Sequence, residues 1–438
     1  MADIVSDTVP PRLHLEGLAY VPGRVEGVLR RGPSISDPDD ILIIRMDEVD
    51  AVSGRPGGIL VVDGAPLSHR MIRLLGIGVP TVIVDARQGR QLPPGTRAVL
   101  DGASGRVNDS ASHAVAECPA PAIPQAGHPV HTADGVPVRL LASVRHAGAA
   151  RQAVAAGAAA IGLVRSEFLE PADGAQPDAD YFARTFAELC NAAAPLAVTF
   201  RLLDACPDKR PAWLPLIDGF GSALGLQGAR LFAVEPVHGV VEAQLQAIAA
   251  LGAHHTLRVI IPYLTRYEEL QHWAAWARAL LPPTISLGAM VETPASALDL
   301  GNWFDVVDFV ALGCNDLMQG LFAADRDRPE LAGFLDPYAP LLYRFLQQMA
   351  KAADTHLHQV QLCGVLPQLR GVLPILLGLG YRTFSVDAVH IPYLAHAVRE
   401  LQLSDAERLA GQVCHARSSA EVAARLGLSP TACRPFPA

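Results

Sequence analysis

Six polar side chains in the second half of the sequence follow short apolar runs, where buried strands would end. They are Arg165, Arg201, Glu292, Asn315, Asp316 and Cys363. Arginine binds phosphate through paired charge-assisted hydrogen bonds, and Mg2+ takes one or two carboxylates together with substrate oxygens. The set therefore predicts a site for a phosphorylated anion and a divalent cation, provided that the fold brings the six side chains together.

Each of these residues has a simpler interpretation when it is taken alone. Arginine and glutamate at strand ends often pair only with one another. A lone Cys363 would more often be a small buried apolar residue than an acid catalyst. The coincidence of six such residues at strand ends is what favours a functional site over these separate interpretations.

The elements that must position these residues recur from residue 136 onward. Short β-branched runs alternate with Ala- and Leu-rich amphipathic stretches, a pattern typical of repeated βα units. The strand candidates are VRLLASV, AAIGLV, LAVTFRLLD, LRVIIPYL, TISLGAMVE, VVDFVALG, QVQLCG and YRTFSV. They predict an α/β fold with a C-terminal (β/α)8 TIM barrel over residues 136–438, in which all carboxyl ends of the strands open onto one face. From about Ser404 we expect short helices and a proline-containing tail.

Residues 12–115 form a second region with a different pattern. Short apolar runs such as ILIIR and PTVIVD alternate with Gly, Pro and Asp turns, which predicts a small β-rich domain with a helix after Ser68. Residues 116–135 are rich in Pro and Ala and read as an interdomain linker. His69 would begin the helix, where amide donors can hold a phosphate. Taken alone, it is more simply a surface or capping residue.

Composition limits the classes of function. The chain has 438 residues, of which 50% are hydrophobic and 18% charged, which suits two or three compact domains. A net charge of -9 without a basic run argues against nucleic acid and membrane partners. Neither a signal segment nor a membrane-spanning run is visible, so we expect a soluble, cytoplasmic protein. Seven scattered cysteines with no CxxC pair predict neither disulfides nor structural zinc.

Several motifs resemble the phosphoenolpyruvate-utilising family, which includes enzyme I of the bacterial sugar phosphotransferase system, phosphoenolpyruvate synthase and pyruvate phosphate dikinase. They are GAAAIGLVRSEFL, VTFRLLD followed by PDK, LGAMVETPAS, VDFVALGCNDLMQ followed by AADRD, QLCG and GYRTFSVDAVHIP. The resemblance implies a barrel that binds phosphoenolpyruvate or pyruvate. In relatives, the positions matching Arg165, Arg201 and Arg326 bind substrate phosphate or carboxylate. Those matching Glu292 and Asp316 hold Mg2+.

The resemblance assigns three further roles. Asn315 matches a substrate contact, and Cys363 aligns with the acid that protonates the enolate. In the N-terminal region, GGILVVDGAPLSHRMIRLLGIGVPTVIV resembles the family's swivelling phosphohistidine domain, in which His69 matches the phosphorylated histidine. The implied reaction is the Mg2+-dependent interconversion of phosphoenolpyruvate and His69 with pyruvate and phosphohistidine. A separate ATP-grasp or carrier protein would supply or accept the phosphate, and a homodimer through the barrel is one oligomeric state that the relatives suggest.

The sequence departs from the family's motifs at four positions, and two other functions stay open beside the phosphotransferase. Relatives usually carry Arg at Gln227, which leaves Arg230 in that segment, and GVLPQL after Cys363 differs from the family's acidic loop. Leu67 and Cys314 replace threonines. An impaired protein that binds phosphoenolpyruvate or pyruvate and regulates a partner is one alternative. A barrel enzyme acting on another 2-oxo acid or enolate, without use of the histidine, is the other.

Overall fold

The computed structural model describes residues 13–110, 121–206, 210–217, 220–221 and 224–428. The chain divides into two compact units. One comprises the residues up to 66 together with 70–120, and the other comprises 67–69 together with the chain from 121 onward. The expected linker residues 116–120, Lys209 of the PDK motif and the tail from 429 lie outside the described residues.

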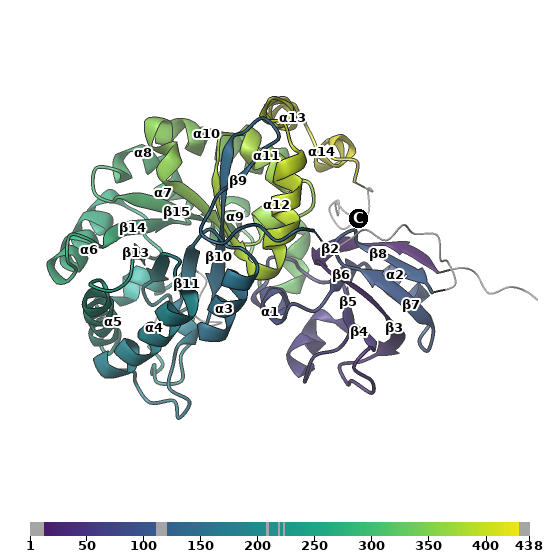
Figure 1. Ribbon diagram of the computed structural model, residues 1–438, viewed down its shortest axis with the longest axis horizontal. Coiled ribbons are helices and arrows are strands. Elements are labelled where there is room, and N and C mark those ends of the chain that lie inside the picture. Colours follow the sequence, from purple (N-terminus) through teal and green to yellow (C-terminus); the bar gives the residue numbers. More distant parts are fainter. Residues whose placement is uncertain (1–12, 111–120, 207–209, 218–219, 222–223, 429–438) are drawn as a thin grey trace, which may run out of the picture. The chain divides into compact units, whose positions relative to one another are not determined.

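The larger unit is built around a closed ring of parallel strands (Figure 1). The strands are β10 (Pro137–Val144), β11 (Ile161–Arg165), β12 (Val198–Arg201), β13 (Leu257–Ile261), β14 (Ser286–Val291), β15 (Phe309–Gly313), β16 (Val360–Cys363) and β17 (Thr383–Asp387). Each strand pairs with the next in chain order, and β10 closes the ring by pairing with both β17 and β11. All eight strand candidates and the TIM barrel are thereby confirmed.

A short additional strand lies in the stretch that composition assigned to the linker. Strand β9 (Val130–His131) pairs antiparallel with the start of β10, where Val138 lies opposite Val130. Residues from 121 onward belong to the larger unit. The described part of this stretch is therefore attached to the barrel sheet.

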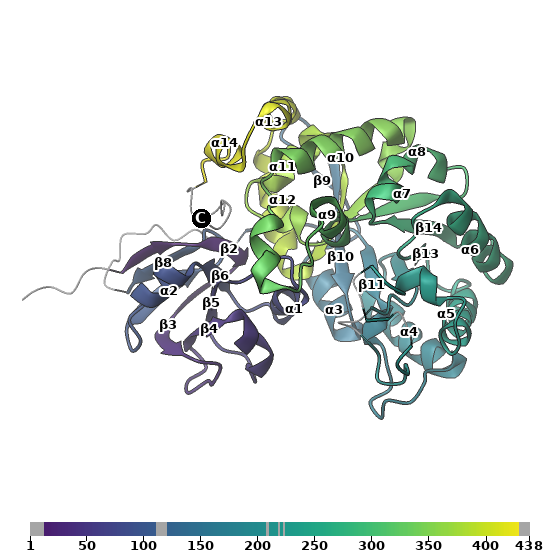
Figure 2. The ribbon, with the colours of Figure 1, turned by 180° about the vertical axis from the view of Figure 1, so that it is seen from behind.

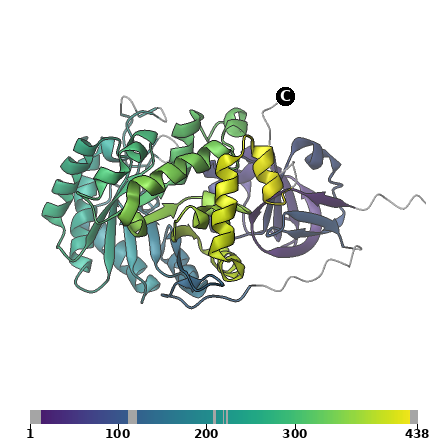
Figure 3. The same ribbon diagram turned by 90° about the horizontal axis from the view of Figure 1, so that it is seen from above.

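Helices surround the barrel, and Figure 2 shows α4, α5 and α6 following one another along its outside. The helices are α3 (Ala147–Ala155), α4 (Ala179–Ala193), α5 (Val237–Leu251), α6 (Tyr267–Leu280), α7 (Pro294–Leu298), α8 (Leu300–Trp303), α9 (Cys314–Phe322), α10 (Pro340–Ala353), α11 (Val372–Gly378), α12 (Ile391–Glu400), α13 (Leu403–His415) and α14 (Ser419–Arg425). Helix α13 packs against α10 and α11 (Figure 3). The helices expected after Ser404 correspond to α13 and α14.

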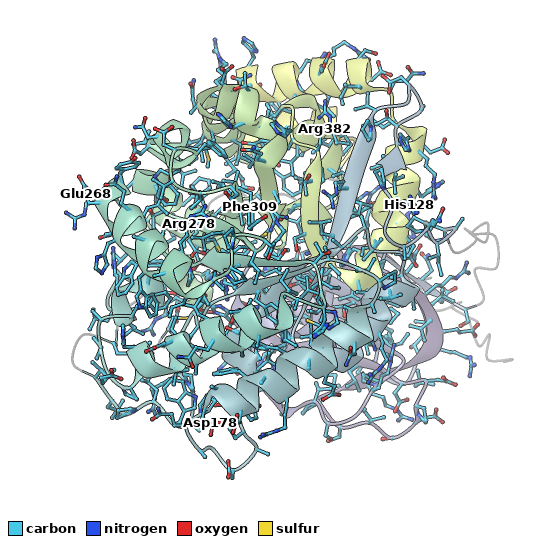
Figure 4. The ribbon with its side chains drawn as sticks, turned by 60° about the vertical axis from the view of Figure 1, so that its left-hand side comes forward. His128, Asp178, Glu268, Arg278, Phe309 and Arg382 are labelled. Atoms are coloured by element: carbon cyan, nitrogen blue, oxygen red, sulfur yellow. The ribbon has the colours of Figure 1, made fainter. Side chains whose placement is uncertain are left out.

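Each outer helix buries one face, as its period of 3.6 residues allows, and successive side chains of each barrel strand point alternately into the barrel and toward the helices. On α10, Leu342, Leu346 and Met349 are buried on one face. Figure 4 shows Glu268 and Arg278 on the outer surface, whereas Phe309 lies inside.

The barrel interior is a packed apolar core. Its cluster consists of Leu163, Ile260, Met290, Phe309, Ala311 and Cys363, contributed by β11, β13, β14, β15 and β16. A Cβ atom at Gly288 would lie 2.5 Å from the Phe309 ring, so glycine at this position makes room for the ring. On the other side, the Arg258 guanidinium carbon lies 3.4 Å from the ring centroid. The strands thus enclose a filled core.

The smaller unit is β-rich, as expected. Its strands are β1 (His14–Glu16), β2 (Leu18–Val21), β3 (Arg24–Arg31), β4 (Ile41–Arg45), β5 (Gly58–Val62), β6 (Thr81–Val84), β7 (Arg97–Asp101) and β8 (Arg106–Asp109). They form one sheet in the order β1-β8-β7-β3-β4-β5-β6-β2, parallel from β3 through β6. The expected helix after Ser68 is α1 (His69–Ile77), whose residues after His69 belong to this unit, and a second short helix is α2 (Ala86–Gln91). Buried side chains including Leu29, Ile41, Leu60 and Leu100 form its core.

Across the described parts of both units, no helix combines the length and apolarity that crossing a membrane requires.

Candidate active site at the carboxyl ends of the barrel strands

Two predicted site arginines lie side by side because they end neighbouring strands. Arg165 is the last residue of β11 and Arg201 is the last residue of β12, and the two are register partners in the parallel pair. Their side chains are 13% and 6% exposed, respectively. Two nearly buried guanidinium groups are therefore held at one edge of the barrel, and arginine binds phosphate through paired charge-assisted hydrogen bonds.

A buried carboxylate connects the two arginines. Glu167 lies in the turn η2 (Ser166–Phe168) directly after β11, and its Oε1 accepts hydrogen bonds from Arg165 Nε at 3.0 Å and from Arg201 Nη2 at 2.5 Å. Asp204 pairs with Arg201 from the other side, with 2.8 Å between Oδ2 and Nη1. Burial alone would lower the pKa of Arg201, but Asp204 and Glu167 hold it above its ordinary range.

The first predicted metal ligand, Glu292, follows β14 and is buried. Its Oε1 accepts a hydrogen bond from the backbone N–H of Tyr263 at 2.7 Å. A Cβ atom at Gly313 would lie 2.6 Å from Oε2, so glycine there leaves space for the carboxylate. Burial and then repulsion by Asp316 and Asp204 raise the pKa of Glu292 to about 8. The free protein therefore keeps this carboxyl largely protonated at neutral pH.

The second predicted metal ligand, Asp316, is in the first turn of α9 and is 24% exposed. Among the described residues, no group of three or more His, Cys, Asp or Glu side chains could hold a metal ion. A Mg2+ ion at this place would therefore take two protein carboxylates and complete its shell with substrate and water oxygens. Such an ion fits, because the repulsion between Glu292 and Asp316, which adds to the effect of burial on the pKa of Glu292, is what a divalent cation would relieve.

Asn315 and Cys363 lie at the ends of the adjacent strands β15 and β16. Asn315 Oδ1 accepts a hydrogen bond from the Val365 N–H at 3.1 Å. Gly364, which follows Cys363 in the sequence, has φ 106°, and a Cβ atom there would be 2.8 Å from Asn315 Oδ1. Glycine is thus required both by the backbone conformation and by the close approach of the amide.

The Cys363 side chain, at the end of β16, belongs to the apolar barrel cluster and is 3% exposed. Gln361 Nε2 lies 3.6 Å from its Sγ atom. Burial raises the pKa of the Cys363 thiol to about 12. The thiol therefore keeps its proton at neutral pH, which suits a proton donor and not a thiolate nucleophile.

The remaining predicted residues are His69 and Arg326. Both belong to the larger unit, which includes residues 67–69 as well as the chain from 121 onward. Arg326 is buried, and its Nη2 lies 3.0 Å from Asp316 Oδ1 and 2.8 Å from His69 Nε2. Asp327 accepts from the backbone N–H of His69 at 3.0 Å, and its Oδ2 lies 2.9 Å from the imidazole Nδ1. Burial would raise the pKa of Asp327, but the contacts with His69 hold it below its ordinary range.

Comparison with known proteins identifies the family. The family model described as "PEP-utilising enzyme, PEP-binding domain" matches residues 124–403. This chain belongs to the family of PEP-utilising enzymes. It is 31% identical, over 91% of its length, to the phosphoenolpyruvate-protein phosphotransferase of Streptomyces coelicolor, of which 73% is covered. It is 30% identical, over 85% of its length, to the protein of the same name from Haloferax volcanii, of which 68% is covered.

A multiphosphoryl transfer protein of Xanthomonas campestris is similar over a smaller share of its own length. The identity is 31% over 84% of this chain and 46% of that protein. The chain therefore spans less than half of this relative and about two thirds to three quarters of the two phosphotransferases.

Three residues of this candidate site were not predicted from the sequence: Glu167, Asp204 and Tyr263. The two acids follow Arg165 and Arg201 by two and three residues in VRSEF and RLLD, and that proximity was a usable signal. Tyr263 has φ 51°, a conformation that no sequence pattern predicts for a tyrosine.

Tyr263 contacts both Gln227, where an arginine was expected from the family resemblance, and Glu292, one of the two predicted metal ligands. It is 7% exposed, its side chain bonds Gln227, and the Arg230 guanidinium carbon lies 5.1 Å from its ring centroid. Gln227 itself is 6% exposed. The glutamine that replaces the family's arginine is thus packed against a phenol at the mouth of the barrel.

Proposed function

We propose that this protein is a Mg2+-dependent phosphotransferase that interconverts phosphoenolpyruvate and His69 with pyruvate and phosphohistidine. The observation that carries the proposal is the arginine pair Arg165 and Arg201 beside the carboxylates Glu292 and Asp316 at one end of the barrel. The names of the relatives, two of them phosphoenolpyruvate-protein phosphotransferases, support the same substrate.

Each residue would have a defined task in the transfer. A His69 nitrogen attacks phosphorus, the bond between phosphorus and the enol oxygen breaks, and the pyruvate enolate leaves. Arg165, Arg201 and Arg326 hold the transferring phosphoryl group, whose charge is spread over its three outer oxygens. When bound by Glu292 and Asp316, Mg2+ would supply further stabilisation of that charge.

One contact of His69 and the burial of Cys363 support the protonation states that the transfer requires. The carboxylate of Asp327 at His69 Nδ1 favours the tautomer with the proton on Nδ1, so that Nε2 carries the lone pair. The buried Cys363 thiol keeps its proton and would donate it to the methylene carbon of the enolate, giving the methyl group of pyruvate. In the reverse direction, the thiolate takes that proton back.

The phosphoryl partner is proposed to be another protein, either an ATP-grasp protein or a carrier protein. The name "protein phosphotransferase" of two relatives favours a protein acceptor. A cytoplasmic location and a homodimer through the barrel belong to the same proposal. Fractionation of cells and light scattering of the purified protein would test them.

His69 must serve both substrate and partner, so we propose that the phosphohistidine domain, residues 12–115, swivels on the segment 116–135. A crosslink between a cysteine placed near His69 and one at the barrel mouth should then slow turnover with the partner. Turnover of the locked protein at the unlocked rate would exclude the swivelling motion.

Isotope exchange tests the proposed half-reaction without a partner. Labelled pyruvate should enter phosphoenolpyruvate in the presence of Mg2+, and His69→Ala should abolish the exchange while phosphoenolpyruvate still binds. Binding without exchange in the natural protein would favour a regulatory function, for which the burial of Gln227 against Tyr263 is the specific support. Turnover of another 2-oxo acid that survives His69→Ala would favour a barrel enzyme that does not use the histidine.

A further inference from the structure

Glu167 is the most completely buried charged side chain that contacts the arginine pair, with 0% of the side chain exposed. It is not one of the two carboxylates proposed to hold Mg2+, and the proposed transfer gives it no chemical step. The turn Ser166–Phe168 directly after β11 folds it back toward the ends of β11 and β12. Its position is therefore set by a turn that directly follows the strand.

One oxygen of Glu167 serves both arginines. Oε1 accepts from Nε of Arg165 and from a terminal nitrogen of Arg201, so the two guanidinium groups are tied to a single point. The next residue of the same turn, Phe168, has its ring centroid 4.7 Å from the Arg165 guanidinium carbon. Arg165 is thus held on one side by the carboxylate and on another by the ring.

We propose that Glu167 is a positioning residue, which fixes Arg165 and Arg201 in the mutual orientation that takes the phosphoryl group. The inference rests on the proposed function and extends it to a residue with no assigned role. Catalysis of phosphoryl transfer depends on groups that are already oriented before the substrate arrives. A carboxylate shared by two arginines provides that orientation at the cost of placing a negative charge beside an anion site.

Because of this negative charge, the direction in which phosphoenolpyruvate affinity changes on neutralising Glu167 tests the proposal. If Glu167 were only a counter-ion, its neutralisation would leave two arginines with more positive potential, and a phosphorylated anion would bind more tightly. If Glu167 orients the arginines, the same change lets both side chains move, and the anion binds more weakly. The two roles therefore predict changes of opposite direction.

The experiment measures binding of phosphoenolpyruvate and of pyruvate with Mg2+ by calorimetry, in a His69→Ala background so that no phosphoryl transfer occurs. Glu167→Gln should raise the Kd of phosphoenolpyruvate about tenfold or more, and that of pyruvate, which lacks the phosphoryl group, less than about threefold. Glu170→Gln is the matched control, because its carboxylate accepts from the Ala212 N–H in the same region and is exposed. It should leave both Kd values unchanged.

Glu167→Asp separates position from charge, because it keeps the charge but withdraws the carboxylate by one methylene. The proposal predicts weaker phosphoenolpyruvate binding for this variant as well. Unchanged or tighter binding of phosphoenolpyruvate by folded Glu167→Gln, or equal losses for both ligands, would overturn it. If Glu167→Gln does not fold, unchanged phosphoenolpyruvate binding by Glu167→Asp would also overturn it. Failure of the His69→Ala protein itself to bind phosphoenolpyruvate would refute the proposed function instead.

Discussion

Binding of Mg2+ at neutral pH should release a proton from Glu292. The carboxyl group is buried, and Asp316 and Asp204 add repulsion, so that its pKa rises from 4.5 to about 8. At that pKa, the group is about nine-tenths protonated at pH 7 and about one-tenth at pH 9. A metal ion must displace the proton before it can use the carboxylate. The apparent Mg2+ affinity should therefore rise about tenfold per pH unit below pH 8 and level off above it.

The same shift determines how the metal-free protein responds to pH. A raised pKa means that the folded state favours the neutral carboxyl group. This contribution to stability is present in full below the unfolded pKa of 4.5 and is lost as the pH rises through about 8. Added Mg2+ should restore stability above pH 8, because the ion stabilises the ionised form.

Calorimetric titration of Mg2+ in two buffers of different ionisation enthalpy measures the released protons. We expect about 0.9 proton per ion at pH 7 and about 0.1 at pH 9. Glu292→Gln should weaken binding and abolish the proton release, and Asp316→Asn should weaken binding; each should remove most Mg2+-dependent activity. Glu268→Gln, at an exposed site on α6, should change neither quantity. Identical heats in the two buffers at pH 7, from a protein that binds Mg2+, would refute the reasoning.

Three further changes have defined outcomes. Cys363→Ala should slow deuterium incorporation into the methyl group of pyruvate at least tenfold while phosphoenolpyruvate still binds; an unchanged rate would remove the thiol from the mechanism. Gln227→Arg should tighten phosphoenolpyruvate binding in calorimetry by about 1.5–3 kcal/mol, the contribution of one charge-assisted hydrogen bond, and no gain would mean that the pocket is built for a different ligand. Gly288→Ala should destabilise the protein by about 1–3 kcal/mol in thermal unfolding, because its Cβ atom would lie 2.5 Å from the Phe309 ring. Gly411→Ala, where the added carbon meets nothing within 4 Å, should not destabilise it.

The barrel could be predicted from the sequence because its strands are buried on both faces. Such strands read as continuous apolar runs, as LRVII and FVALG do for β13 and β15. The site followed from the same pattern, since polar residues at the ends of parallel strands share one face. Arg165 and Arg201 illustrate this, because their strands are neighbours and their register makes them partners.

Other features depend on geometry that the sequence does not carry. Glu167 was visible as a charge near Arg165, but only the turn after β11 brings its carboxylate onto Arg201 as well. The backbone of Tyr263 at φ 51° points its N–H at Glu292, and no residue preference predicts it. The two-residue strand β9 is too short to show any alternation, which is why its surroundings read as linker.

Single-turnover labelling tests the central claim most directly. The full chain is mixed with phosphoenolpyruvate carrying labelled phosphorus and Mg2+, quenched, and mapped by proteolysis and mass spectrometry. The account predicts about one acid-labile phosphate per chain on His69, no label in His69→Ala, and loss of the label when pyruvate is added in excess. A natural protein that binds phosphoenolpyruvate and Mg2+ but never acquires the label, or that carries it on another residue, would contradict the account.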